Sequence, residues 1–134
     1  MANKVYPKWK EAILQASANS ALTGTLKVAL IDAADYTYSD SHQFFSDVAG
    51  AAVVGTPQTL SNKTYVNGIL DADDATIPSV TGDQSEALLI YLDTGSAATS
   101  RLVAYIDTGV TGLPVTPNGG DINIGWNAAG IIQF

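Results

Sequence analysis

The amino-acid sequence predicts a mainly β protein, an antiparallel β-sandwich with a short N-terminal α-helix. After about residue 24 the chain is a series of short apolar runs separated by Gly, Pro, Asn and Asp, and runs repeated at intervals of about 8 to 15 residues are typical of sandwiches and barrels. No linker or change of composition divides the 134 residues. We therefore expect a single domain over residues 1–134, with either jelly-roll or immunoglobulin-like connectivity.

The opening segment predicts a helix over about residues 6–18. Pro7 suits the first position of a helix, and Trp9, Ile13 and Ala16 follow at spacings of four and three residues. These spacings place the three side chains on one apolar face. A polar stretch that contains Asn, Ser, Thr and Gly then ends the helix.

The next segments alternate between strand and loop. Thr25–Ile31 predicts a strand with one core face, because its large apolar residues alternate with smaller or polar ones. Residues 32–43 are rich in Asp, Ser and Tyr and show no periodicity, which indicates a long surface excursion. A short helical turn is expected at residues 44–48.

Two long apolar runs, Glu86–Asp93 and Arg101–Asp107, are typical of strands buried on both faces. We expect them to form a hairpin at the core, joined by the loop Thr94–Ser100. The other expected strands are Ala51–Gly55, Gln58–Leu60, Lys63–Leu70, Ala75–Val80, Leu113–Thr116, Asp121–Trp126 and Gly130–Phe134. Within them, Pro57 and Pro78 suit sheet edges or bulges, and Asn67-Gly68 suits a tight turn or a bulge.

Composition narrows the possible partners. Hydrophobic residues make up 46% of the chain and charged residues only 14%, so much of the surface must be uncharged, which favours oligomerisation or assembly. The net charge of −7 disfavours binding to nucleic acid. Lys4, Lys8, Lys10 and Lys27 all fall in the first 27 residues, and this basic segment suits an acidic partner. No stretch is long enough to span a bilayer, and we expect no signal peptide and no membrane contact.

Little catalytic chemistry is available, because the chain has no cysteine and one histidine. Asp-Thr-Gly, a triplet of aspartic proteases, occurs at Asp93 and at Asp107. Those enzymes need two carboxylates about 3 Å apart, whereas a hairpin would separate these two by roughly 20 Å along its strands. We therefore interpret both triplets as turns and expect no enzyme, with a carboxylate hydrolase as the catalytic alternative.

One acidic cluster is a candidate metal site. Asp71, Asp73 and Asp74 alternate in a way that would suit Ca²⁺. The segment lacks the glycine and the distal glutamate of an EF-hand loop, so a solvated turn is the favoured interpretation. We expect no cofactor.

Segments spread over most of the chain carry a resemblance to a known family. They are the helix region Tyr6 to Leu14, Leu26-Lys-Val-Ala-Leu30, Ser41-His-Gln-Phe-Phe45 with Asp47, Leu60-Ser-Asn-Lys-Thr64, Asp71-Ala-Asp-Asp74, Ile90-Tyr-Leu-Asp-Thr-Gly95, Leu102-Val-Ala-Tyr-Ile-Asp107 and Trp126-Asn-Ala-Ala-Gly130. In this pattern of strands and turns the chain resembles a family of small structural proteins from tailed bacteriophages.

The resemblance implies a virion protein that is assembled in the host cytoplasm. We expect a capsid decoration or cement protein that lies over junctions between major capsid subunits, where repeated weak contacts add up by avidity. The alternatives are a tail, collar or neck component and, in another class, a host-glycan-binding module. A homo-oligomer is expected. The residues expected to contact the major capsid protein or other virion proteins are Lys8, Trp9, Lys10, Tyr36, Tyr38, His42, Phe44 and Phe45.

Overall fold

The computed structural model describes residues 3–14 and 24–133, and its elements confirm a mainly β, antiparallel protein. The elements in chain order are β1 (Lys4–Val5), α1 (Pro7–Leu14), β2 (Thr25–Ile31), two 3-10 turns (Phe45–Asp47 and Gly50–Ala52), β3 (Val53–Thr59), β4 (Thr64–Val66), β5 (Ile69–Asp71), β6 (Ala75–Ile77), β7 (Ala87–Asp93), β8 (Arg101–Ile106), β9 (Ile122–Ile124) and β10 (Ile132–Gln133).

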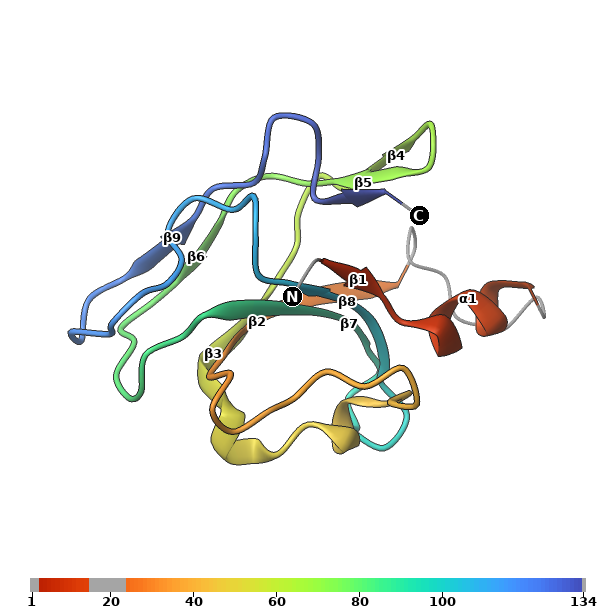
Figure 1. Ribbon diagram of the computed structural model, residues 1–134. Coiled ribbons are helices and arrows are strands. Elements are labelled where there is room, and N and C mark those ends of the chain that lie inside the picture. The colour runs from red at the N-terminus through yellow and green to blue at the C-terminus, as the bar shows by residue number, and fades with distance from the viewer. Residues whose placement is uncertain (1–2, 15–23, 134) are drawn as a thin grey trace.

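The strands form a sandwich of one large sheet and two small ones. The five-stranded sheet has the order β1-β8-β7-β2-β3, and the smaller sheets have the orders β10-β5-β4 and β6-β9. Figure 1 shows the small sheets on one side of the large sheet. On the other side lies the chain between β2 and β3, which we call the 32–52 segment.

The expected hairpin at the core is confirmed. β7 pairs with β8 in antiparallel register, with Leu88 opposite Ile106 and Leu92 opposite Arg101. Every residue of β7 except the last is buried, and so is every residue of β8 except the first. Both faces of the hairpin are covered because the small sheets and the 32–52 segment lie on opposite sides of it (Figure 1).

β2 has the expected bounds but not the expected single core face. Leu26, Val28 and Leu30 are buried as predicted, and Ala29 and Ile31 are fully buried as well. The prediction failed because the alternation of residues along a strand does not show which other segments of the chain cover its two faces. The second cover comes from the 32–52 segment, whose ends meet where the Asp32 N–H donates to the Ala52 carbonyl (2.9 Å).

The N-terminal helix begins at Pro7, as expected, and is described to Leu14. The rest of the helix expected over residues 6–18 lies outside the described residues. A short strand that the sequence did not predict, β1, precedes the helix and pairs with β8. The Tyr6 N–H continues this pairing by donating to the Val103 carbonyl (3.0 Å).

Four expected strands differ in detail. Ala51–Gly55 and Gln58–Leu60 form one strand, β3, and Lys63–Leu70 is a hairpin of β4 and β5. Its turn is Asn67-Gly68, where both residues have positive φ. Leu113–Thr116 is not a strand, since only Val115 bridges to Ser85. Pro114 lies in this segment and has no N–H to donate to a ladder.

Candidate partner-binding site

A cluster of aromatic residues joins the N-terminal segment to the 32–52 segment. The Tyr36 hydroxyl lies 2.7 Å from the Tyr6 hydroxyl and 2.8 Å from His42 Nδ1. The Tyr38 ring lies 4.9 Å from that of Tyr6 and 5.9 Å from that of Tyr105 on β8. The cluster therefore brings together three residues that were expected to meet a partner, namely Tyr36, Tyr38 and His42.

Burial fixes the protonation of these phenols. Tyr6 is fully buried and Tyr36 is 5% exposed. Desolvation raises the pKa of Tyr6 far above its usual value, and it raises the pKa of Tyr36 as well. Both hydroxyls keep their protons at neutral pH and serve as donors and acceptors inside the protein. Tyr36 anchors the 32–52 segment rather than presenting its ring to solvent.

The two phenylalanines fix the far end of the same segment against β8 and β7. The Phe45 ring stacks on that of Tyr91, with centroids 4.1 Å apart. The Arg101 guanidinium lies over the Phe44 ring, 5.2 Å from its centroid. Backbone bonds add to this contact, because the Phe45 N–H donates to the Ser100 carbonyl (2.8 Å). Both rings are half-buried.

Asp47 closes the turn that carries the phenylalanines. Its Oδ2 accepts hydrogen bonds from the backbone N–H groups of Gln43 (2.8 Å) and Phe44 (3.1 Å). These bonds stabilise the carboxylate and lower the pKa of Asp47 below its usual value. The expected helical turn at residues 44–48 is thus confirmed as a 3-10 turn.

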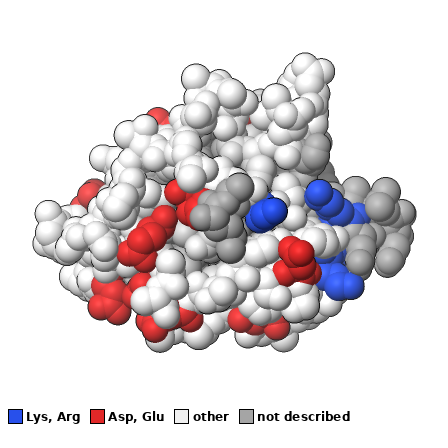
Figure 2. Space-filling model, in the orientation of Figure 1, with Lys and Arg blue, Asp and Glu red and all other residues white. Residues whose placement is uncertain are grey.

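The N-terminal lysines carry most of the positive charge on their face of the molecule. Figure 2 shows Lys and Arg gathered at the end with α1, while most Asp and Glu in this view lie elsewhere. Lys10 is exposed and Lys8 is half-buried. Trp9, placed between them in the sequence, is only 3% exposed and belongs to the core. Lys8 and Lys10 can therefore meet a partner from this end, and Trp9 holds the helix on the body.

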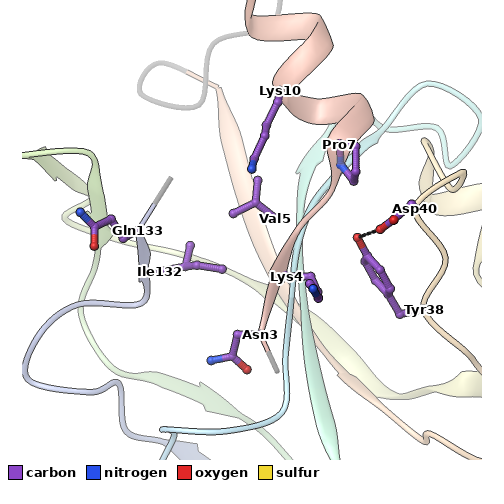
Figure 3. A pocket seen from close by; sticks show the side chains of 9 residues that line it. All are labelled: Asn3, Lys4, Val5, Pro7, Lys10, Tyr38, Asp40, Ile132 and Gln133. Atoms are coloured by element: carbon purple, nitrogen blue, oxygen red, sulfur yellow. Dashed lines mark hydrogen bonds between the residues drawn. The ribbon is translucent and has the colours of Figure 1, made fainter. Parts of the chain in front are cut away.

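A pocket of about 390 Å³ adjoins this basic end. Four parts of the chain line it: the β1 region, α1, the 32–52 segment and β10. In Figure 3, Lys10 extends from α1 toward Val5, with Ile132 and Gln133 on one side and Tyr38 and Asp40 on the other. The Tyr38 hydroxyl donates to the Asp40 carboxylate (2.6 Å). Sequence reasoning missed this pocket because its lining combines residues that lie far apart in the sequence, such as Lys4 and Gln133.

The three carboxylates considered as a metal candidate each accept a hydrogen bond from a different group. Asp71 accepts the backbone N–H of Ala72, Asp74 accepts that of Trp126, and Asp73 accepts the Asn62 side-chain amide. The carboxylates are therefore each engaged with a different part of the chain. The trio of carboxylates that converges in the described part of the chain is Asp32, Asp35 and Asp83.

The two Asp-Thr-Gly triplets lie at opposite ends of the β7–β8 hairpin, as expected from the register. Asp93 accepts the Gly95 N–H (3.1 Å) and pairs with Lys27 (3.2 Å). The backbone hydrogen bond and the lysine together lower the pKa of Asp93. At the other end, the Asp107 N–H donates to the Asn3 side chain (2.8 Å). The first triplet thus closes a turn, and the second begins where the chain after β8 is joined to the residue that precedes β1.

No family model and no curated protein matches this chain. Within residues 3–14 and 24–133, no helix combines the length and the apolar character needed to cross a membrane.

Proposed function

We propose that this protein is a structural protein of a bacteriophage virion, and specifically a capsid decoration protein. It would lie over junctions between major capsid subunits and stabilise the head. The proposal rests on the resemblance described above, and the structural observation that supports it most directly is the separation of charge over the surface.

The charge separation supports docking in one orientation. Lys4, Lys8 and Lys10 fall within seven residues, on a protein of net charge −7. A basic end on an acidic body is attracted to an acidic surface and is repelled in other orientations, which is how complementary charge fixes orientation and suppresses wrong contacts. A protein repeated over a symmetric shell needs such a fixed orientation.

The order of the 32–52 segment supports the same proposal. Its ends meet through Asp32 and Ala52, and its aromatic side chains pack on β7, β8 and the N-terminal segment. A surface that is already ordered loses little conformational entropy on binding. Each weak contact with the shell can then count fully toward avidity.

The aromatic side chains favour decoration over glycan binding. A glycan platform needs rings that face solvent, whereas none of the aromatic residues within 3–14 and 24–133 is fully exposed. Two of the half-buried rings, those of Phe44 and Tyr38, are engaged with Arg101 and Asp40.

The test is co-sedimentation of the purified protein with capsids that lack it. We expect saturation at a fixed, high ratio to the major capsid protein. Binding of only a few copies per particle would instead support a tail, collar or neck component. Absence of binding to heads and tails, together with retention on a glycan array, would contradict the proposal.

A further inference from the structure

We propose that the pocket beside β1 binds an extended acidic segment of a partner protein, which adds to β1 as a further strand. This inference rests on the proposed function and specifies the partner element that the basic end recognises. It follows from the sheet edges that border the pocket, from the direction of the β1 backbone and from the charges around it.

Two sheet edges border this pocket. β1 is the outermost strand of the large sheet, and β10 is an outermost strand of the three-stranded sheet. The pocket is lined by Lys4 and Val5 from β1 and by Ile132 and Gln133 from β10. Edge strands have one side without a strand partner, and an extended peptide commonly occupies such a side.

The register of β1 indicates which backbone groups are available. Lys4 lies opposite Tyr105 and Val5 opposite Ala104, and the Tyr6 N–H donates to Val103. In an antiparallel ladder, hydrogen-bonded and non-hydrogen-bonded pairs alternate. The pair next to Tyr6 is therefore non-hydrogen-bonded, which turns the N–H and C=O of Val5 away from β8. A partner strand would bond to these groups.

The edge is held in place before any partner arrives. Asn3 precedes β1 and lines the same pocket. Its Oδ1 accepts the N–H groups of Asp107 (2.8 Å) and Thr108 (3.1 Å), and its Nδ2 donates to the Thr108 carbonyl (3.0 Å). Such anchoring reduces the ordering cost of strand addition.

The charges select an acidic segment. Among the described residues that line the pocket, Lys4 and Lys10 are accompanied by one carboxylate, that of Asp40. Figure 3 places Asp40 beside Tyr38, on the side of the pocket away from Ile132. An acidic segment on the β10 side would meet Lys10, which extends toward Val5 in Figure 3, and its apolar side chains would contact Val5 and Ile132.

The acidic run at residues 71–74 of a second copy of this chain is poorly suited to occupy the pocket. Asp71, Asp73 and Asp74 are bonded to Ala72, Asn62 and Trp126 within the fold. We therefore assign the site to a different protein rather than to a second copy.

The first experiment uses the fluorescently labelled peptide acetyl-Glu-Val-Glu-Val-Glu-Val-amide as a probe of the full chain, read by anisotropy at low salt. We expect saturable binding that weakens as salt is added. The same peptide with Lys in place of Glu should not bind. Equal binding of the two peptides would overturn the inference.

Backbone methylation tests the strand geometry. Alternate N–H groups of an extended peptide point to opposite edges, so methylating the three Glu nitrogens blocks one edge and methylating the three Val nitrogens blocks the other. Strand addition predicts that one methylated peptide loses binding and the other keeps it. Retention of binding by both would overturn the inference.

Variants of the protein test the charges. Lys10→Gln should weaken binding about two- to fivefold, as expected for the loss of one exposed ion pair, and Asp40→Asn should strengthen it. Lys27→Gln is the matched control, because it changes net charge equally but lies on β2, which β8 and β7 separate from β1. An equal loss in Lys10→Gln and Lys27→Gln would mean that only net charge matters and would overturn the inference.

The two proposals can fail separately. Peptide binding with no attachment to capsids would contradict the decoration function and support this pocket as the site for another acidic partner. Attachment to capsids that is unchanged by Lys10→Gln, together with no peptide binding, would overturn this inference alone.

Discussion

At the scale of single residues, the Tyr36 hydroxyl joins two separate parts of the chain. It contacts Tyr6 Oη and His42 Nδ1, at 2.7 and 2.8 Å. Tyr36→Phe would leave the hydroxyl of Tyr6, which is fully buried, without this partner. Because an unsatisfied buried polar group costs about 1–3 kcal/mol, we expect the free energy of unfolding to fall by about that amount in urea titration.

The matched control is Tyr91→Phe. Tyr91 is also buried and its ring stacks on Phe45, but its hydroxyl makes no hydrogen bond within the described part of the chain. This change should alter stability by less than about 0.5 kcal/mol. Equal losses in the two variants would show that the hydroxyl bridge at Tyr36 does not contribute.

Asp93 gives a second residue-scale prediction, which concerns pH. The Gly95 N–H and Lys27 lower its pKa in the folded protein below the usual 3.8. A lowered folded pKa stabilises the protein above the unfolded pKa, and this contribution is lost as pH falls through the folded pKa. Asp93→Asn should therefore be less stable at neutral pH, by up to about 1 kcal/mol for a partly exposed ion pair.

Thermal unfolding across pH checks this expectation. The difference between wild type and Asp93→Asn should shrink as pH falls below 3.8, the usual pKa of the group. Lys27→Gln keeps the Gly95 hydrogen bond and should lose only part of the pH dependence. A difference between wild type and Asp93→Asn that stays constant from neutral to acid pH would contradict the assigned cause.

At the scale of elements, Gly55 lets β3 bend away from β2. The pairing shifts between Val28 opposite Gln58 and Leu30 opposite Val54, so β3 carries extra residues there. Gly55 has φ of +73°, and a Cβ at this position would lie 3.2 Å from the Ile77 side chain. Gly55→Ala should lower the free energy of unfolding by about 1–3 kcal/mol, because the left-handed conformation is strained for alanine.

Gly50→Ala is the control for this bend. Gly50 lies in the 3-10 turn just before β3, and a Cβ there would meet nothing within 4 Å. Chemical denaturation of the two variants should show a clear loss for Gly55→Ala and almost none for Gly50→Ala. A similar loss in both would mean that chain flexibility, rather than the bend, determines the effect.

The elements also show which features local sequence could predict. The apolar runs of β7 and β8 fixed their position, hairpin pairing and two-sided burial, because a strand without polar positions has no face for solvent. The two-sided burial of β2 and the burial of Tyr36 were not predicted, for one shared reason. Their second cover comes from packing between the 32–52 segment and the large sheet, which no local pattern records.

At the scale of the whole molecule, the pocket lay beyond sequence reasoning. Its lining joins Lys4 near the start of the chain to Gln133 near its end, and β1, at two residues, is too short to show a strand pattern. The basic character of the N-terminal segment was predicted, since it is a property of composition. What composition could not indicate is that the lysines border a sheet edge.

The separation of charge leads to a prediction for the assembled particle. Exchanging Lys4, Lys8 and Lys10 for Gln would remove the basic end and change the net charge from −7 to about −10. Capsid attachment by this variant should weaken, and wild-type attachment should weaken as salt rises, because the screening length falls from about 10 Å at 0.1 M to about 3 Å at 1 M. Co-sedimentation across salt concentrations, with circular dichroism as the control for folding, measures both effects. If attachment were unchanged by the three substitutions and by salt, apolar contacts of the 32–52 segment would have to hold the protein on the shell, and the basic end would have no part in docking.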